Sequence, residues 1–129
     1  MANTDEFGLS AIAQIAVVVH SIEEMTRFYR DKLGLKLLFE VPNMTFFDCD
    51  GIRLMLSLPS SSEFDHPASI IYFKVRDIQN AFAVLSERGV NFEGKPRIIA
   101  QLEVRDLWVA FLRDPENNLL ALMSEVERS

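Results

Sequence analysis

A strand pattern followed by a helix pattern marks residues 14–34 as the first clear structural unit of the chain. Hydrophobic residues at alternate positions within 14–19 predict a strand whose two faces have different surroundings. Ser21, with Glu24 three residues later, predicts a helix that begins with a capping box. The apolar stripe of this helix comprises Ile22, Met25, Phe28, Tyr29 and Leu33. Gly34 is suited to the left-handed conformation that ends a helix, so the unit is predicted to be a strand, a tight turn and a helix.

The same unit occurs a second time at residues 70–89. Asp77 takes the position that begins the helix, and Gly89 takes the position that ends it. Ser21 and Asp77 are 56 residues apart, and Gly34 and Gly89 are 55 apart. The apolar stripe of the second helix comprises Ile78, Ala81, Phe82 and Leu85. A repeat at nearly constant offset predicts two copies of one module, each of which needs the other to bury its apolar face.

Short hydrophobic stretches after each helix predict the remaining strands. In the first module they lie at 35–41, 44–49 and 52–58, with the hairpin signal Asp50-Gly51 before the last of them. In the second module they lie at 97–104, 107–113 and 119–123, after a short extended stretch at 90–93, with Asn117 suited to a left-handed turn. Each module therefore has the order βαβββ. We expect a single domain, residues 1–129, with the first module at 10–59, a Ser- and Pro-rich linker at 60–67 and the second module at 68–125.

Composition and charge exclude several functional classes. A chain of 129 residues is long enough to bury a core without disulfides. The net charge of −6 argues against a nucleic-acid surface, because phosphate binding needs clustered Lys and Arg. No apolar run has the length of a membrane span, and the polar residues 1–8 do not have the pattern of a signal peptide. With Cys49 as the single cysteine, we expect a protein of the reducing cytoplasm that has neither a membrane nor a nucleic acid as its partner.

Three segments resemble the vicinal oxygen chelate superfamily, which includes glyoxalases, bleomycin-resistance proteins, fosfomycin-resistance enzymes and extradiol dioxygenases. These segments are FYRDKLGL at 28–35, SERGV at 86–90 and FLRDPENNLLAL at 111–122. The resemblance implies an α+β fold in which two βαβββ modules form a half-open, eight-stranded mixed sheet, the glyoxalase/bleomycin-resistance fold. It also implies helices outside the sheet, a ligand site inside it and a homodimer. Because many chemistries share this scaffold, the resemblance does not define an activity.

The resemblance further implies four positions at which the metal-dependent members hold a divalent ion. These positions correspond to Gln14, Met55, Ile70 and Ala121. The Gln14 amide oxygen suits a hard or borderline ion, but the Met55 thioether is soft and the other two side chains are hydrocarbon. We therefore expect no metal at the usual site and no cofactor.

The other reactive side chains give weaker signals. His20 and His66 are predicted to lie at the surface, and the alternative is an unusual zinc site that they form with Glu63, Asp65 or Glu125. Cys49 lies between two aspartates, which raise the pKa of a thiol rather than lower it. We therefore expect Cys49 to be inert.

Strand alternation, with its phase set by the resemblance, divides the strand residues between two faces. The face predicted to line the cavity comprises Gln14, Ala16, Val18, Arg53, Met55, Ser57, Ile70, Tyr72, Lys74, Leu119, Ala121 and Met123. The opposite face is apolar throughout and is predicted to pack under the helices; it comprises Ile15, Val17, Val19, Leu54, Leu56, Ile71, Phe73, Val75, Leu120 and Leu122. The residues that we expect to bind a ligand are Gln14, Arg53, Met55, Ser57, Ile70, Tyr72, Lys74, Ala121 and Met123. A mostly apolar wall with a few polar groups is typical of a small-molecule site.

The charged groups of this face give conflicting indications about the ligand. Arg53 and Lys74 suit a carboxylate or phosphate, and Tyr72 suits stacking or hydrogen bonding. The alternative is that both cations reach into solvent and pair with acidic side chains. The overall charge of −6, by contrast, suits a cationic ligand.

Three functions are consistent with the sequence. The leading hypothesis is a protein that binds a small molecule in the cavity without the usual metal, as bleomycin-resistance proteins sequester a drug. The alternative is a lyase, isomerase or dioxygenase of the glyoxalase kind, with a displaced metal site or a metal-free acid–base mechanism that uses Gln14 and Tyr72. The third is a subunit whose cavity is filled by its own side chains and which serves only in assembly.

Overall fold

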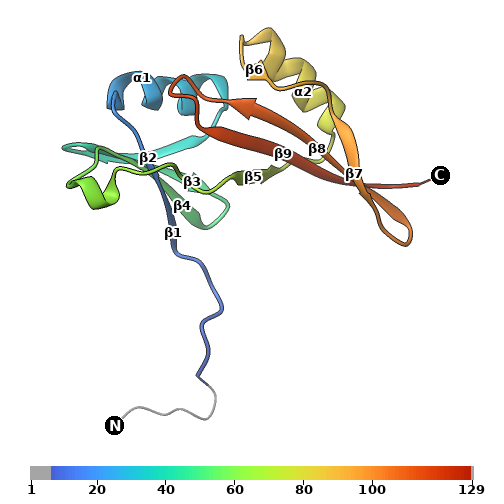
Figure 1. Ribbon diagram of the computed structural model, residues 1–129, viewed down its shortest axis with the longest axis horizontal. Coiled ribbons are helices and arrows are strands. Elements are labelled where there is room, and N and C mark those ends of the chain that lie inside the picture. The colour runs from blue at the N-terminus through green and yellow to red at the C-terminus, as the bar shows by residue number, and fades with distance from the viewer. Residues whose placement is uncertain (1–6, 129) are drawn as a thin grey trace.

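The computed structural model describes residues 7–128 and shows an α+β protein in which two sheets carry both helices on the same side (Figure 1). The remaining residues, 1–6 and 129, which include most of the polar N-terminal stretch, lie outside the described residues. Neither helix within 7–128 combines the length and the apolar character that crossing a bilayer requires.

Sheet one is formed by the first half of the chain. Its strands, in spatial order, are β1 (Gln14–Val18), β4 (Ile52–Ser57), β3 (Met44–Cys49) and β2 (Lys36–Val41). Strands β1 and β4 are parallel, and the other neighbours are antiparallel. The hairpin turns use left-handed residues, with φ of 69° at Asn43, 54° at Asp50 and 96° at Gly51. The Asp50-Gly51 hairpin is thus confirmed.

Sheet two repeats this arrangement in the second half of the chain. Its strands are β5 (Ile71–Lys74), β9 (Leu119–Glu127), β8 (Arg105–Arg113), β7 (Arg97–Gln101) and the short β6 (Asn91–Phe92). Strands β5 and β9 are parallel, and β8 pairs with β9, β7 and β6 in antiparallel register. Asn117, in the turn between β8 and β9, has a φ of 68°, as predicted.

Both helices begin and end close to the predicted residues. Helix α1 (Ile22–Arg27) continues as a π-helical turn, η1 (Phe28–Lys32), and α2 spans Ile78–Glu87. Both helical segments are followed by left-handed glycines, Gly34 with φ 79° and Gly89 with φ 85°. The linker contains one 3₁₀ turn, η2 (Ser62–Phe64).

The capping predictions differ between the two helices. Asp77 caps α2 by accepting a hydrogen bond from the Asn80 N–H at 3.0 Å. The capping box predicted for α1 is wrong, because the Ser21 side chain makes no capping hydrogen bond. Instead, the Glu116 carboxylate accepts from the Ser21 N–H at 2.7 Å. A side chain 95 residues away in sequence therefore replaces the local cap.

The core lies between the sheets and the helices. Every residue of the predicted core face belongs to this core, either buried or partly buried. The apolar stripes of both helices contribute buried side chains to the same cluster, among them Met25, Tyr29 and Leu85. The division of the strand residues into two faces is thus confirmed, because only the helix side of each sheet has apolar side chains at every alternate position.

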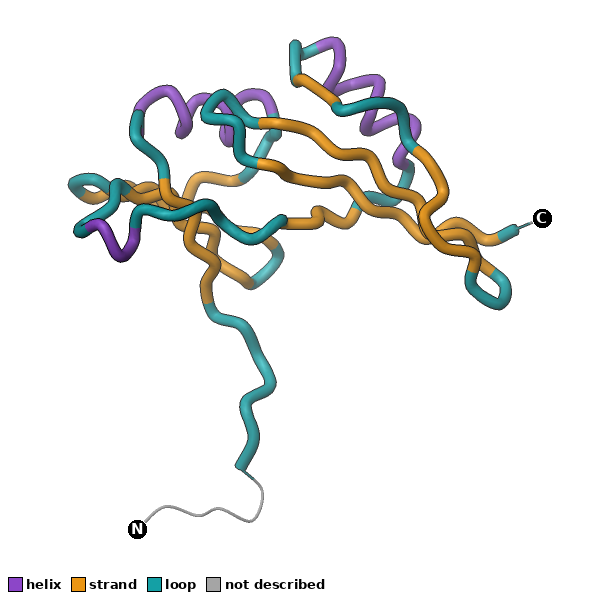
Figure 2. The backbone as a smooth tube through the Cα atoms, in the orientation of Figure 1, coloured by secondary structure: helices purple, strands orange, loops and turns teal. Residues whose placement is uncertain are grey.

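The fold class is confirmed, with two differences in detail. The strands form two sheets of four and five strands rather than one sheet of eight, and the short strand β6 accounts for the additional one. Residues 7–13 extend away from the rest of the molecule as a loop without regular structure (Figure 2). The face of each sheet opposite the helices is called the cup face below.

Candidate functional site

The cup face of sheet one carries the candidate residues of the first half of the chain. Gln14 lies opposite Arg53, and Ser57 lies opposite Val18 in the parallel pairing of β1 and β4. The Gln14 amide donates a hydrogen bond to the Met55 sulfur at 3.7 Å. These residues are exposed or half-buried, so this part of the face is open.

An aromatic pair forms the outer part of the same face. The Phe46 ring stacks on Phe39 with ring centroids 4.5 Å apart, and the Arg53 guanidinium carbon lies 5.7 Å from the Phe46 centroid. A cation over an aromatic face is attracted by the ring quadrupole. Arg53 thus packs against the sheet through its stem while its charged end stays accessible.

On sheet two, an aromatic pair covers the candidate residue Ala121. Ala121 lies on β9, between β5 and β8. Its partners in register are Tyr72 on β5 and Phe111 on β8. These two strands are not adjacent, yet the ring centroids are only 6.0 Å apart, so the rings lean toward each other above Ala121. Ala121 is fully buried as a result. A ligand on this face contacts the two rings rather than Ala121.

A pocket of about 550 Å³ lies where sheet one meets β5, and it is called the seam pocket here. It is lined by Ile15, Leu35, residues 48–50 and 52–54, and the whole of β5, residues 71–74. Arg53, Tyr72 and Lys74, the three polar candidates predicted to recognise a ligand, all line it. Apolar side chains of β1, β4 and β5 form most of the remaining wall.

A second pocket, called the basic pocket, lies on the cup face of sheet two. It has a volume of about 620 Å³ and is lined by residues 72, 74–76, 105 and 123–125. It brings the candidates Tyr72, Lys74 and Met123 together. Ile70 is exposed just before β5, whereas Gln14, Met55 and Ser57 lie on sheet one outside both pockets.

Comparison with known proteins agrees with this architecture. The family model described as the Glyoxalase/Bleomycin resistance protein/Dioxygenase superfamily matches residues 11–122. The chain belongs to this superfamily. The resemblance seen in the sequence is thereby confirmed.

Individual proteins are similar over most of the chain. The uncharacterized protein YraH of Bacillus subtilis is 27% identical over 125 residues, which cover 86% of this chain and 95% of YraH. A superfamily member from Sphaerobacter thermophilus is 25% identical with a TM-score of 0.75, over 91% of this chain and 98% of that one. Lactoylglutathione lyase from Agrobacterium tumefaciens is 18% identical with a TM-score of 0.70, over 90% and 94% of the two chains, which indicates a shared fold.

The metal positions of the superfamily do not fit a divalent ion in this chain. The thioether of Met55 accepts from the Gln14 amide, and Ala121 is fully buried under aromatic rings. Ile70 offers no lone pair. Within residues 7–128, no group of three or more His, Cys, Asp or Glu side chains is arranged to hold a metal ion elsewhere. A hard cation needs several converging oxygen or nitrogen ligands, and these positions do not provide them.

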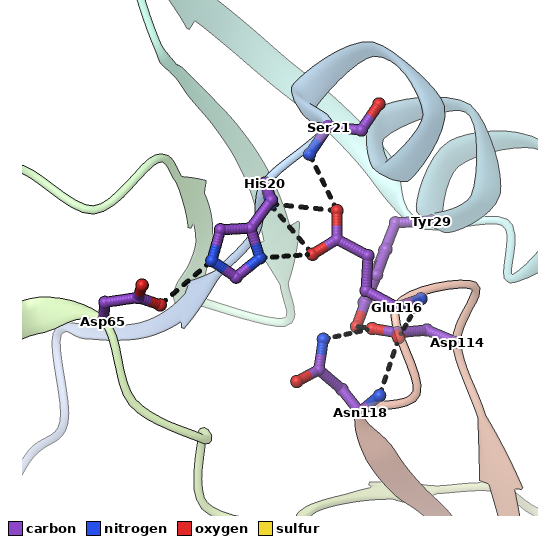
Figure 3. A network of polar contacts seen from close by, with 7 residues as sticks. All are labelled: His20, Ser21, Tyr29, Asp65, Asp114, Glu116 and Asn118. Atoms are coloured by element: carbon purple, nitrogen blue, oxygen red, sulfur yellow. Dashed lines mark hydrogen bonds and ion pairs between the residues drawn. The ribbon is translucent and has the colours of Figure 1, made fainter.

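A network of polar contacts joins the two halves of the chain at the start of α1 (Figure 3). The Glu116 carboxylate accepts from the His20 N–H at 2.8 Å and the Ser21 N–H at 2.7 Å. The His20 ring contacts Glu116 through Nδ1 at 3.2 Å and Asp65 through Nε2 at 2.9 Å. Both partners of the ring are carboxylates, and only the doubly protonated imidazolium donates to both. The contact with Asp65 raises the pKa of His20, and the contact with Glu116 raises it further.

The stability of the protein is therefore expected to depend on pH through His20. Because its folded pKa lies above the unfolded value of about 6.5, its contribution is complete below that value and is lost as pH rises through the folded pKa. Urea denaturation of the wild type and of His20→Gln at pH 6.0 and 8.5 measures this contribution. The difference in the free energy of unfolding between the two proteins is expected to be larger at pH 6.0. An equal difference at both pH values would contradict the inference that His20 is an imidazolium in the folded protein.

A second polar cluster lies next to the first, in the turn between β8 and β9. Tyr29 on η1 is fully buried, and its hydroxyl donates to Asp114 Oδ2 at 2.8 Å. Burial, together with the nearby Asp114 carboxylate, raises the pKa of Tyr29 far above its usual range. The residue is therefore neutral at physiological pH and has a structural role.

The remaining candidates behave largely as the sequence indicates. Burial, and then the charge of Asp48, raise the pKa of the Cys49 thiol. His66 contacts only the Pro67 carbonyl among the described hydrogen bonds, at 3.0 Å. Because its thiol pKa is raised, Cys49 is unsuited to act as a nucleophile.

Sequence reasoning missed Glu116 and the two arginines of the basic pocket, Arg76 and Arg105. Glu116 is 96 residues from His20, and no local pattern connects a turn residue to a distant helix start. Arg76 follows β5 and Arg105 begins β8, where strand alternation assigns no clear face. The sequence indicates a basic surface there only through the two cations, Lys74 and Arg76, at the predicted end of this strand.

Proposed function

We propose that the protein binds a small, partly apolar molecule in the seam pocket, without the divalent metal of the metal-dependent superfamily members. The observation that carries this proposal is the convergence of Arg53, Tyr72 and Lys74 on one pocket of about 550 Å³. This volume lies in the range of small-molecule sites, and the wall is mostly apolar with a few polar groups. The three side chains come from two different sheets, so a ligand here contacts both halves of the chain.

The chemistry of the lining suits binding better than catalysis. The guanidinium of Arg53 and the ammonium of Lys74 are donors for an oxyanion, and Tyr72 offers an aromatic edge and a hydroxyl. Asp48, which lies opposite Arg53 in the pairing of β3 and β4, and Asp50 also line the pocket and are able to accept from a donor on the ligand. In the metal-free form of the enzyme alternative, Tyr72 and Gln14 are the candidate polar groups, and these two residues do not line the same pocket.

A homodimer in the cytoplasm is part of the proposal. The extended segment 7–13 exposes Phe7, Leu9 and Ile12, whose exposed fractions are 75%, 94% and 62%. Three large apolar side chains on one short extended segment favour contact with a second copy of the chain. A cytoplasmic location is consistent with a single free thiol at Cys49.

A thermal-shift screen of small aromatic and aliphatic compounds tests the proposed function. Compounds that bind only the folded state raise the melting temperature by mass action. We expect such compounds to lose at least tenfold in affinity with Tyr72→Ala or Lys74→Gln. The matched control is Lys95→Gln, which removes an exposed lysine from the loop before β7 and is expected to change nothing.

The outcomes of the screen separate the functions. A compound that is recovered unchanged after incubation supports binding, whereas conversion to a product that is lost with Tyr72→Phe would favour the enzyme. Absence of any stabilising compound would indicate a filled cavity and an assembly role.

A further inference from the structure

We propose that the basic pocket is an oxyanion site, and that the ligand of the seam pocket is an amphipathic molecule whose anionic end, such as a phosphate monoester, lies there. This inference rests on the proposed function, because it assigns a charged end to the same ligand. It identifies a chemical class of ligand from the distribution of charge along β5.

The basic pocket concentrates positive charge in an acidic protein. Lys74, Arg76 and Arg105 line it together with a single carboxylate, Glu125. The whole chain, by contrast, has a net charge of −6. Within residues 7–128, no ion pair involves Lys74 or Arg76, and the contact of Arg105 with Glu127 is long, at 3.5 Å, between exposed side chains. The described part of the chain therefore neutralises the charge of this pocket only in part.

Strand register places these groups on one face. Lys74 lies opposite Met123, and Arg105 lies opposite Glu127, so alternate residues of β9 share the cup face with both cations. The Ser124 hydroxyl donates to the Arg76 carbonyl at 3.3 Å, and the Val75 N–H donates to the Met123 carbonyl at 2.9 Å. These bonds extend the ladder beyond the end of β5 and hold the backbone of Arg76 beside β9.

The two pockets are adjacent and share two residues. Tyr72 and Lys74 line both the seam pocket and the basic pocket. The Tyr72 ring contacts Phe111 edge to face, at 6.0 Å between centroids, and is available to a ligand in either pocket. The apolar part of a ligand in the seam pocket therefore lies next to Lys74, which also lines the basic pocket together with Arg76 and Arg105.

The positive charge of the basic pocket suits an oxyanion that accepts several hydrogen bonds. Among the residues that line the pocket, three cations and one carboxylate leave an excess of two positive charges, and Glu127, which lies opposite Arg105 and 3.5 Å from it, offsets part of this excess. A phosphate monoester carries nearly two negative charges at neutral pH and accepts bidentate hydrogen bonds from guanidinium groups. Lys74 adds a compact donor at the boundary with the apolar compartment.

Isothermal titration with a pair of probes tests this inference. The probes are 1-naphthyl phosphate and 1-naphthol, which have the same aromatic body and differ in the oxyanion. For the wild-type protein in 50 mM NaCl, we expect the phosphate to bind at least tenfold more tightly than the alcohol. Because salt screens charge, this preference is expected to decrease in 300 mM NaCl.

The variant Arg76→Gln/Arg105→Gln is expected to reduce the affinity for the phosphate to that for the alcohol, without changing the affinity for the alcohol. The matched control is Arg27→Gln, which removes an exposed arginine from α1 and is expected to keep the preference. Melting temperatures of all variants establish that they are folded.

Each outcome of the titration has a defined meaning. Equal affinity for the two probes overturns the oxyanion site and leaves the proposed function standing. A phosphate preference that survives Arg76→Gln/Arg105→Gln, or that is lost equally with Arg27→Gln, overturns the location of the site. Failure of both probes to bind also overturns the inference, whereas the proposed function is judged separately by the thermal-shift screen of unrelated compounds.

Discussion

Replacement of Asp114 by alanine is expected to lower the free energy of unfolding by about 3–4 kcal/mol, since it removes hydrogen bonds to a charged acceptor and leaves buried donors unpaired. The Asp114 carboxylate is buried and accepts four hydrogen bonds, from the Tyr29 hydroxyl, the Asn118 side chain, and the Glu116 and Asn118 N–H groups. These contacts hold the turn between β8 and β9 against η1. Loss of the carboxylate therefore affects the two halves of the chain together.

Urea denaturation measures this effect, and Tyr29→Phe is the matched control. Tyr29→Phe keeps the ring in the core and removes only the hydroxyl, so the expected cost is about 1–2 kcal/mol. In the double variant the two effects should not add, because the substitutions remove the same contact. If Asp114→Ala cost no more than Tyr29→Phe, the hydrogen bonds from Glu116 and Asn118 would have no measurable role.

Replacement of Glu116 by alanine is expected to cost about 2 kcal/mol, the upper range for losing a helix cap. The carboxylate of Glu116 accepts from two backbone N–H groups at the start of α1 and from the His20 ring. Its side chain is only 16% exposed, so solvent does not readily replace these contacts. Without the carboxylate, the donors of His20 and Ser21 lose their acceptor and the negative charge beside the helix start is removed.

Two further variants separate this cap from the capping box that the sequence predicts. Glu24→Ala removes the residue of the predicted box and is expected to cost less than 0.5 kcal/mol, in the range of surface substitutions. Glu116→Gln keeps one acceptor oxygen and is expected to lie between the wild type and Glu116→Ala. A larger loss with Glu24→Ala than with Glu116→Ala, measured by urea denaturation, would show that α1 is capped locally.

These two carboxylates connect the halves of the chain at a distance from the seam pocket. Glu116 reaches α1 and Asp114 reaches η1 from the same short turn. The seam pocket lies beside β5, between sheet one and sheet two. Since the β8–β9 turn fixes the first helix against sheet two, it helps to set the spacing of the sheets and thus the shape of the pocket.

Most of the fold was predictable because it depends on local patterns. Alternation placed Val17 and Leu54 on the core side and Arg53 on the cup side, as the structure has them. Turn residues were equally informative, because Asp50, Asn117 and the glycines that end the helical segments are types that tolerate positive φ. The capping box of α1 failed because a distant carboxylate competes successfully for the same N–H group.

The candidate site was predictable only in part. Alternation selected Tyr72 and Lys74 as cup-side residues, but their place beside Arg53 depends on how β5 approaches sheet one. Ala121 was selected by its position in the strand, yet the rings of Tyr72 and Phe111 cover it. Side-chain direction follows from the strand, whereas the lean of a side chain over its neighbour depends on the packing around it.

The sequence by itself determined the repeated strand–helix unit and the strand faces, because both depend on residue type and spacing along the chain, and its resemblance to the superfamily indicated an unfavourable set of side chains at the metal positions. Only the tertiary structure decided which cations converge beside β5, which carboxylate caps α1 and which candidates share a pocket. Those outcomes depend on contacts between residues far apart in sequence, such as His20 and Glu116, which are 96 positions apart. Such contacts are set by the packing of the complete core, and no local pattern encodes them.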